Sequence, residues 1–215
     1  MLRHKYSYIQ KGKKGKNMRR LLITLCLAVI CAFTFAQNAA YKKAVSKYKN
    51  IASLTATATR TVHKAAVAKD KVTTGTLYVK DKGGKVLIAN GKDALLMNGT
   101  AFTMKKGPLK AKTDSNKDSQ YKTFHDVLVS IFNGGTTDIS HHSDIKMVKS
   151  GTNIILTITP VSSKKKQMFS SFIVTIDGKA QELRSIRMMQ KGGSYTEYTF
   201  TGYKLGASVS DKVFK

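Results

Sequence analysis

The sequence contains few groups that could carry chemistry, and cysteine is the scarcest of them. Cys26 and Cys31 are the only cysteines among 215 residues, and both precede residue 37. If the first 36 residues are removed, the remaining chain has no cysteine. That excludes a disulfide framework, a thiol nucleophile and a cysteine-ligated zinc site from the rest of the protein.

Carboxylates are scarce as well. Only 12 acidic residues accompany 38 basic ones, which gives a formal net charge of +26. Residues 1–36 hold eight of the basic residues and no acid, so residues 37–215 keep a net charge of +18. Such a charge suits nucleic acid, an anionic membrane or an acidic partner. The alternative is a role in solubility, because most lysines alternate with apolar residues as they do on solvated strand faces.

Signatures of catalysis and metal binding are also missing. The chain has no Gly-x-Ser-x-Gly, phosphate-binding loop, dinucleotide-binding glycine pattern or His-Glu-x-x-His. His141, His142 and Asp144 would need a loop to share a metal, since adjacent strand residues point to opposite faces. The calcium-loop-like run from Asp114 has Ser119 at the glycine position. We therefore expect no enzymatic activity, metal or cofactor, with a hydrolase of unrecognised site as an alternative.

A long apolar run lies near the start of the sequence. It extends from Leu21 to Phe35, follows the basic Met18-Arg19-Arg20 and ends at Ala36. A short basic stretch, about 15 apolar residues and small residues at the end are typical of a secretory signal peptide. The run is shorter than the about 20 apolar residues that a membrane span needs. An uncleaved membrane anchor is the alternative interpretation.

The leader defines the expected domain organisation and location. We predict cleavage near Ala36, which separates a leader of residues 1–36 from a single domain of residues 37–215. Residues 1–17 are basic and polar, so Met18 is the expected true start. The mature protein is expected in the periplasm, which argues against a nucleic-acid partner despite the charge.

After the leader, the spacing of apolar residues is typical of strands, with two segments that have helical spacing. Helical spacing predicts helices over 39–52 and 121–132. The dipeptides Gly83-Gly84, Asn90-Gly91 and Asn98-Gly99 separate short apolar runs, which is a strong hairpin signal. Residues 107–120 are polar and are expected to form a loop. We expect nine to eleven strands, among them 53–68, 75–80, 85–89, 94–97, 101–105, 145–148, 153–161, 169–177, 183–190 and 195–204.

The order of these segments resembles a known family. It runs from an amphipathic helix through "SLTATATRTV", "TGTLYVKDKGGKVLIANGKDALLMNGTAFTMKKG" and a central helix to "LTITPV", "SSFIVTIDGKAQELRSIRMM" and "YTEYTFTGYKLGASVSDKVF". This resembles the periplasmic outer-membrane lipoprotein carrier proteins, LolA, over Ala39 to Phe214. The first hairpin departs from the family pattern. The family has an arginine there that is tied to the closed state, whereas this chain has Gly83-Gly84-Lys85-Val86, so no arginine is carried over.

The resemblance implies both a fold and a function. The fold is mainly β (α+β): an incomplete, strongly curved antiparallel β-barrel with an N-terminal helix and a central helix closing the cavity. Its apolar concavity holds the acyl chains of lipoproteins. The implied partners are an inner-membrane release complex and an outer-membrane acceptor, and the protein is expected to be a monomer. A periplasmic lipid- or ligand-binding scaffold protein on the same fold, without lipoprotein cargo, is the alternative.

Apolar residues on four sequential strands are the candidate lipid site. An acyl chain of about 16 carbons gains about 12 kcal/mol on leaving water, at about 0.8 kcal/mol per methylene. A curved sheet can offer it one dry side. The predicted cavity residues are Leu77, Val79, Leu87, Leu95, Met97, Phe102 and Met104, and the predicted helical plug is Phe124, Leu128 and Phe132. An ordinary filled core is the alternative. Leu87→Glu is accordingly expected to abolish lipid binding and leave the fold intact.

Overall fold

The computed structural model of the protein describes residues 38–114, 119–159 and 169–215. The predicted leader lies outside these ranges. Eleven strands are present: β1 (Ser53–His63), β2 (Lys71–Lys80), β3 (Lys85–Asn90), β4 (Asp93–Asn98), β5 (Ala101–Lys106), β6 (Leu109–Asp114), β7 (Ile145–Ser150), β8 (Asn153–Ile158), β9 (Ser171–Asp177), β10 (Glu182–Met189) and β11 (Tyr195–Leu205).

The helical part of the described chain is small. Its longest element is α2 (Ser119–Phe132), which follows β6 and precedes β7. Residues 38–45 are also helical. Short 3-10 helices complete the set: η1 (Ser46–Tyr48), η2 (Asp81–Gly83), η3 (Lys191–Gly193) and η4 (Asp211–Phe214). No helix among the described residues has the length and hydrophobicity to cross a membrane.

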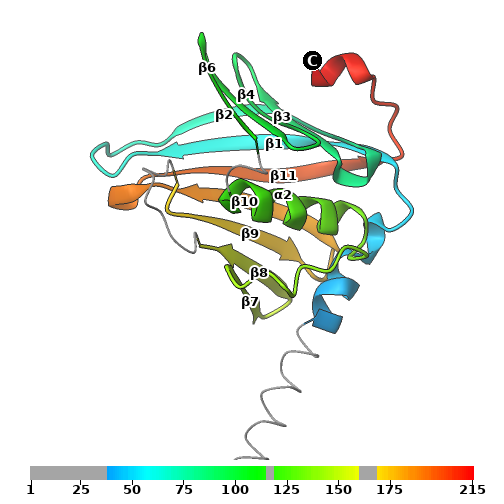
Figure 1. Cartoon of the computed structure of the whole chain (residues 1–215). Helices are drawn as coiled ribbons and strands as arrows, with labels where there is room; N and C mark the ends of the chain where they lie inside the picture. The colour runs from blue at the N-terminus through cyan, green and yellow to red at the C-terminus, as the bar shows by residue number, and fades with distance from the viewer. Residues whose placement is uncertain (1–37, 115–118, 160–168) are drawn as a thin grey trace, which may run out of the picture. The chain divides into compact units, whose positions relative to one another are not determined.

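The sheet consists of two antiparallel meanders that meet at its centre. Its strand order is β6-β5-β4-β3-β2-β1-β11-β10-β9-β8-β7. Strands β1–β6 form the first meander and β7–β11 the second, and the pairing of β1 with β11 joins them. Strands β6 and β7 are the two edges, so the sheet is not closed. Figure 1 shows it curving around the side on which α2 lies, which confirms the predicted incomplete barrel.

Two β-bulges contribute to this curvature. Between Thr55 and Thr57 of β1, the partner strand β11 advances three residues, from Lys204 to Thr201. A second irregularity lies between Leu183 and Ser185 of β10. An extra residue on one strand bends that strand and increases its local twist. The long central strands can therefore follow the curve of the sheet without losing their pairing.

The structure confirms the predicted hairpins and corrects three predicted boundaries. Gly91 and Gly99 have the expected positive φ at the β3–β4 and β4–β5 turns. The loop predicted over 107–120 is wrong, because residues 109–114 form β6 and pair with β5. This strand was missed because it is an edge strand that contains two lysines and no buried residue. The strand predicted over 53–68 ends at His63. The helix predicted over 39–52 is an α-helix only as far as residue 45 and ends with the 3-10 helix η1 at Tyr48.

Candidate functional site

One face of the sheet is apolar across both meanders, and α2 lies against it. In the first meander Leu77 pairs with Ile88, Ile88 with Leu95, and Leu95 with Met104. A second row joins Val79, Val86, Met97 and Phe102 in the same way. Directly paired residues project from the same side of a sheet. We call this side the concave face and the opposite side the outer face.

The concave face brings together six of the seven residues predicted to line a cavity. Leu77, Val79, Leu95, Met97 and Phe102 are buried there, and the half-buried Met104 packs against the same core. Phe124, Leu128 and Phe132 of α2 belong to the same buried cluster, and the Phe102 ring contacts the rings of Tyr121 and Phe124. We call this arrangement, with α2 on the concave face, the closed state.

The placement of Leu87 with these residues is wrong. Leu87 pairs with Tyr78 and Leu96, whose side chains lie on the outer face. It is buried there against Val209 and Phe214 from the C-terminal segment, residues 206–215. Strand β3 has three consecutive buried apolar residues. The alternation of apolar and polar residues therefore could not identify which of them faces inward.

Sequence reasoning missed further residues of the concave face. Val86 and Ile88 flank Leu87 and point inward, and counting register across the β2–β3 turn would have found them. The second meander supplies a matching apolar half, since its strands alternate buried and half-buried residues. Its buried members are Ile154, Leu156, Ile158, Phe172, Val174, Ile176, Leu183, Ile186 and Met188.

Helix α2 covers the concave face through its aromatic residues. All three predicted plug residues, Phe124, Leu128 and Phe132, are at most 1% exposed. The Phe124 ring stacks on Phe172 of β9 with centroids 4.4 Å apart and meets Phe102 of β5 edge to face at 6.5 Å. One helix thus contacts both meanders, as a cover between the two halves of the sheet would.

The C-terminal half of α2 is held by close backbone packing and by buried hydrogen bonds. Gly83 in η2 lies so near the helix that a Cβ there would be 3.1 Å from the Phe132 Cβ. The Tyr41 hydroxyl donates to Ser130 Oγ at 2.8 Å, and Ser130 donates to the Thr137 carbonyl at 2.7 Å. The N-terminal half makes ring contacts through Tyr121 and Phe124, and Asp126 lies 3.2 Å from His142 in the loop before β7.

A charged cluster lies on the side of α2 away from the core. Asp126 Oδ2 is 2.6 Å from Lys122 Nζ and 3.2 Å from His142 Nε2, while His125 Nδ1 is 3.5 Å from Oδ1. Burial acts to raise the pKa of the Asp126 carboxyl, but Lys122 and the two histidines hold that pKa below its usual value. The carboxylate is therefore charged at neutral pH and links α2 to the loop before β7. No set of three or more His, Cys, Asp or Glu side chains is arranged to bind a metal in the described part of the chain.

The C-terminal segment covers an apolar patch of the outer face. Phe214 is 3% exposed against Leu87, and Asp211 in η4 holds the segment by two ion pairs. Its carboxyl oxygens lie 2.9 Å from Lys80 Nζ and 2.9 Å from Lys85 Nζ. These hydrogen bonds lower the pKa of Asp211 to about 2.

Acid is therefore expected to loosen the C-terminal segment. The pKa of Asp211 is lower in the folded protein than the value of about 3.9 for a free aspartate. The stabilisation by the two lysines is thus complete above that value and is lost as the pH falls through about 2. An NMR titration of the Asp211 carboxyl and the Phe214 ring protons measures this. Asp211→Asn should give the loosened Phe214 signals already at pH 7, whereas titration of the wild-type carboxyl near pH 4 with unchanged Phe214 signals would contradict it.

Most of the described chain matches a known protein family. The family model described as outer membrane lipoprotein carrier protein LolA matches residues 49–215. No curated protein matches the chain in sequence. Among solved structures, the chain resembles a LolA superfamily protein from Nitrosomonas europaea at 10% identity, covering 82% of this chain and 96% of that one, with a TM-score of 0.39.

Two further solved structures are similarly distant. A DUF1329 family protein from Desulfovibrio piger has 13% identity over 82% of this chain and 96% of its own, with a TM-score of 0.43. The lipoprotein LppX from Mycobacterium tuberculosis has 14% identity over 81% of this chain and 97% of its own, with a TM-score of 0.37. Likenesses at this level say nothing about ligands. The family model, in contrast, matches well over half of the chain, and the protein therefore belongs to the LolA family of outer membrane lipoprotein carrier proteins.

Proposed function

We propose that the protein is a periplasmic carrier that binds the acyl chains of lipoproteins on its concave face and shuttles them from the inner to the outer membrane. One observation carries this proposal. A continuous apolar face spans both meanders, and in the described residues short helical segments cover it instead of a second sheet. Family membership agrees with this use of the face.

The energies of the closed and the loaded state are of similar size. Helix α2 buries five large apolar side chains, Phe124, Val127, Leu128, Ile131 and Phe132. Burial of such a side chain contributes about 1.5–3 kcal/mol, so the cover is worth about 7–15 kcal/mol. One acyl chain of about 16 carbons gains about 12 kcal/mol on leaving water. A single chain thus competes evenly with α2, and a cargo with more than one chain displaces it.

Release and delivery follow from the same balance. When cargo leaves, α2 returns to the concave face, so the apolar surface is not left in water. This exchange needs a donor that presents lipoproteins at the inner membrane and an acceptor that removes them at the outer membrane. We propose that the protein serves these partners as a monomer, without catalysing a reaction.

Cargo recovered with the protein tests the proposal. The protein would be purified from the periplasm without detergent, and bound material identified by mass spectrometry of intact complexes and of lipid extracts. We expect acylated lipoproteins at up to one per carrier. Absence of both lipoprotein and lipid from freshly isolated protein would contradict the carrier function.

The alternative is a periplasmic lipid- or ligand-binding scaffold protein without lipoprotein cargo. The same apolar face favours it equally, since an acyl chain binds whether or not a protein is attached to it. Recovery of free lipids without any lipoprotein in the same purification would select this second function.

A further inference from the structure

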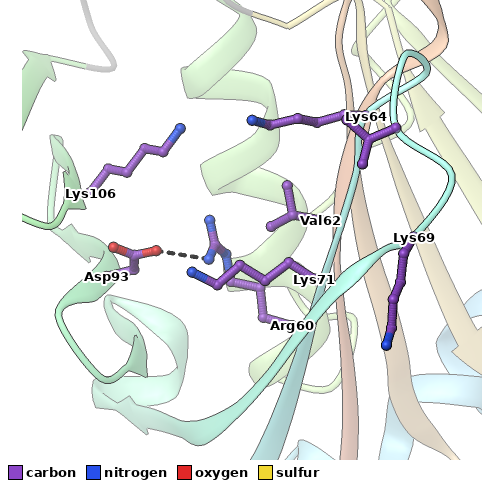
Figure 2. Close-up of a pocket in the computed structure, with 8 residues that line it drawn as sticks. Arg60, Val62, Lys64, Lys69, Lys71, Asp93 and Lys106 are labelled. Atoms are coloured by element: carbon purple, nitrogen blue, oxygen red, sulfur yellow. Dashed lines mark hydrogen bonds and ion pairs between the residues drawn. The ribbon is translucent and has the colours of Figure 1, made fainter.

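A small hollow opens at the end of the concave face where the β1–β2 hairpin and the β3–β4 and β5–β6 turns lie. Its volume is about 280 Å³. Five cationic side chains, one carboxylate and two valines line it. Figure 2 shows Lys64 and Lys106 extending into the same space from opposite sides, with Arg60 and Asp93 beneath them. We call it the cationic hollow.

The floor of the cationic hollow is a buried arginine. Arg60 is 9% exposed, and its Nη1 donates to Asp93 Oδ2 at 2.8 Å. The other carboxyl oxygen of Asp93 accepts from the Gly107 amide at 2.8 Å. Both oxygens of the only carboxylate in the lining are therefore engaged. Arg60 Nε is buried without a hydrogen-bond partner among the described residues, and the Arg60 side chain also interacts with the hydroxyl of Tyr198, its cross-strand neighbour on β11.

Among the residues that the structure describes, the lysines of the hollow have no counter-ion. Within residues 38–114, 119–159 and 169–215, no carboxylate lies within ion-pair distance of Lys64, Lys71 or Lys106. Like charges in one hollow repel each other, and an anion placed among them removes that repulsion. A phosphate or carboxylate group can also accept several charge-assisted hydrogen bonds at once.

The cationic hollow continues the apolar concave face. Arg60 follows the fully buried Ala58 by two residues on β1, so both side chains project from the same side. From Leu54 to Arg60 the strand extends about 20 Å at about 3.3 Å per residue. A lipid chain spans about 15 Å, half the hydrocarbon thickness of a bilayer. An acyl chain along β1 would therefore place its polar end at the hollow.

Two valines distinguish the hollow from a site for a fully hydrated ion. Val62 and Val67 form part of its lining, and Val67 is 49% exposed. An apolar wall beside cations fits a ligand with both an anionic group and an adjoining hydrocarbon chain. A free phosphate would use the cations but gain nothing from the valines.

We propose that the cationic hollow binds the phosphate or carboxylate head group of an amphiphile whose acyl chain lies on the concave face. This proposal rests on the proposed function, because it assumes that an acyl chain replaces α2 on that face. It adds a preference for anionic over neutral amphiphiles. The Arg60–Asp93 pair holds the floor of the site, and Lys64 and Lys106 contact the bound anion.

Calorimetric titration with matched probes tests the preference. Dodecyl phosphate, dodecyl maltoside and inorganic phosphate would each be titrated into the purified protein below the micelle concentrations of the two amphiphiles. We expect dodecyl phosphate to bind about tenfold more tightly than dodecyl maltoside, as one or two charge-assisted hydrogen bonds would give. The double variant Lys64→Gln with Lys106→Gln should lose this preference and keep its affinity for dodecyl maltoside.

A control variant that removes two other lysines distinguishes binding in the cationic hollow from general attraction by the positive charge of the protein. Lys112 of β6 and Lys146 of β7 are exposed and do not line the hollow, so their double substitution by glutamine should leave the preference intact. An equal loss in both double variants, or equal binding of the two amphiphiles by the wild type, would overturn the head-group site and leave the carrier function standing. Inorganic phosphate binding as tightly as dodecyl phosphate would overturn it in favour of a free-anion site. Failure of both amphiphiles to bind would instead contradict the proposed function.

Discussion

Phe124→Ala is expected to lower the free energy of unfolding by about 3–5 kcal/mol, the usual cost of removing a buried phenylalanine ring. Phe124 is fully buried and stacks on Phe172, so the substitution leaves a cavity between α2 and the second meander. The same substitution should raise acyl-chain affinity about tenfold or more, because the closed state loses packing that the loaded state does not use. Thermal unfolding and titration with a fluorescent fatty acid measure the two effects.

A phenylalanine on the outer face provides the control. Phe214 is 3% exposed and packs on Leu87, away from α2. Phe214→Ala should lower stability without changing acyl affinity. If Phe124→Ala were destabilising but bound fatty acid no better than the control, α2 would not be the element that lipid displaces.

Ile88→Glu is expected to weaken acyl-chain binding by about 100-fold or more, whereas Leu87→Glu should leave it unchanged. The two residues are adjacent on β3, but Ile88 lies on the concave face and Leu87 on the outer face. A carboxylate at position 88 would have to be buried against hydrocarbon, which costs several kcal/mol, and each 1.4 kcal/mol is about tenfold in affinity. Fatty-acid titration measures the binding, and circular dichroism checks that each variant is folded.

A milder substitution protects this comparison against loss of folding. Val86 also lies on the concave face and is 1% exposed. Val86→Thr replaces one methyl group by a hydroxyl with little change in volume, so it should reduce affinity less than Ile88→Glu but in the same direction. Weaker binding in Leu87→Glu than in Ile88→Glu would mean that lipid uses the outer face.

The strand order was predictable from sequence where turns and period agreed. The Asn-Gly dipeptides placed β3, β4 and β5 correctly because glycine at those turns supplies the positive φ that a tight hairpin needs. The i, i+3, i+4 spacing of Phe124, Val127 and Leu128 predicted α2 for an equally local reason. Six of the seven proposed cavity residues lie on one face, because alternate residues of a strand point to the same side of the sheet.

Features that depend on partners distant in sequence were not predictable. Leu87 is buried by the C-terminal segment more than 120 residues later, and no local pattern in β3 contains that information. The pairing of β6 with β5 depends on backbone hydrogen bonds, which its polar side chains do not reveal. The hollow at Arg60 was missed for the same reason, since Arg60, Asp93 and Lys106 come from three separate strands.

The pairing of the first strand with the last has a consequence for biogenesis. Because β1 and β11 form the central seam of the sheet, a chain that ends before Tyr195 leaves two separate hairpin arrays, each with an unpaired inner edge. Such edges are templates for aggregation, and contacts between distant segments form slowly. A newly made chain would therefore stay vulnerable until Tyr195–Leu205 becomes available for pairing, and it would benefit from protection by a chaperone until then.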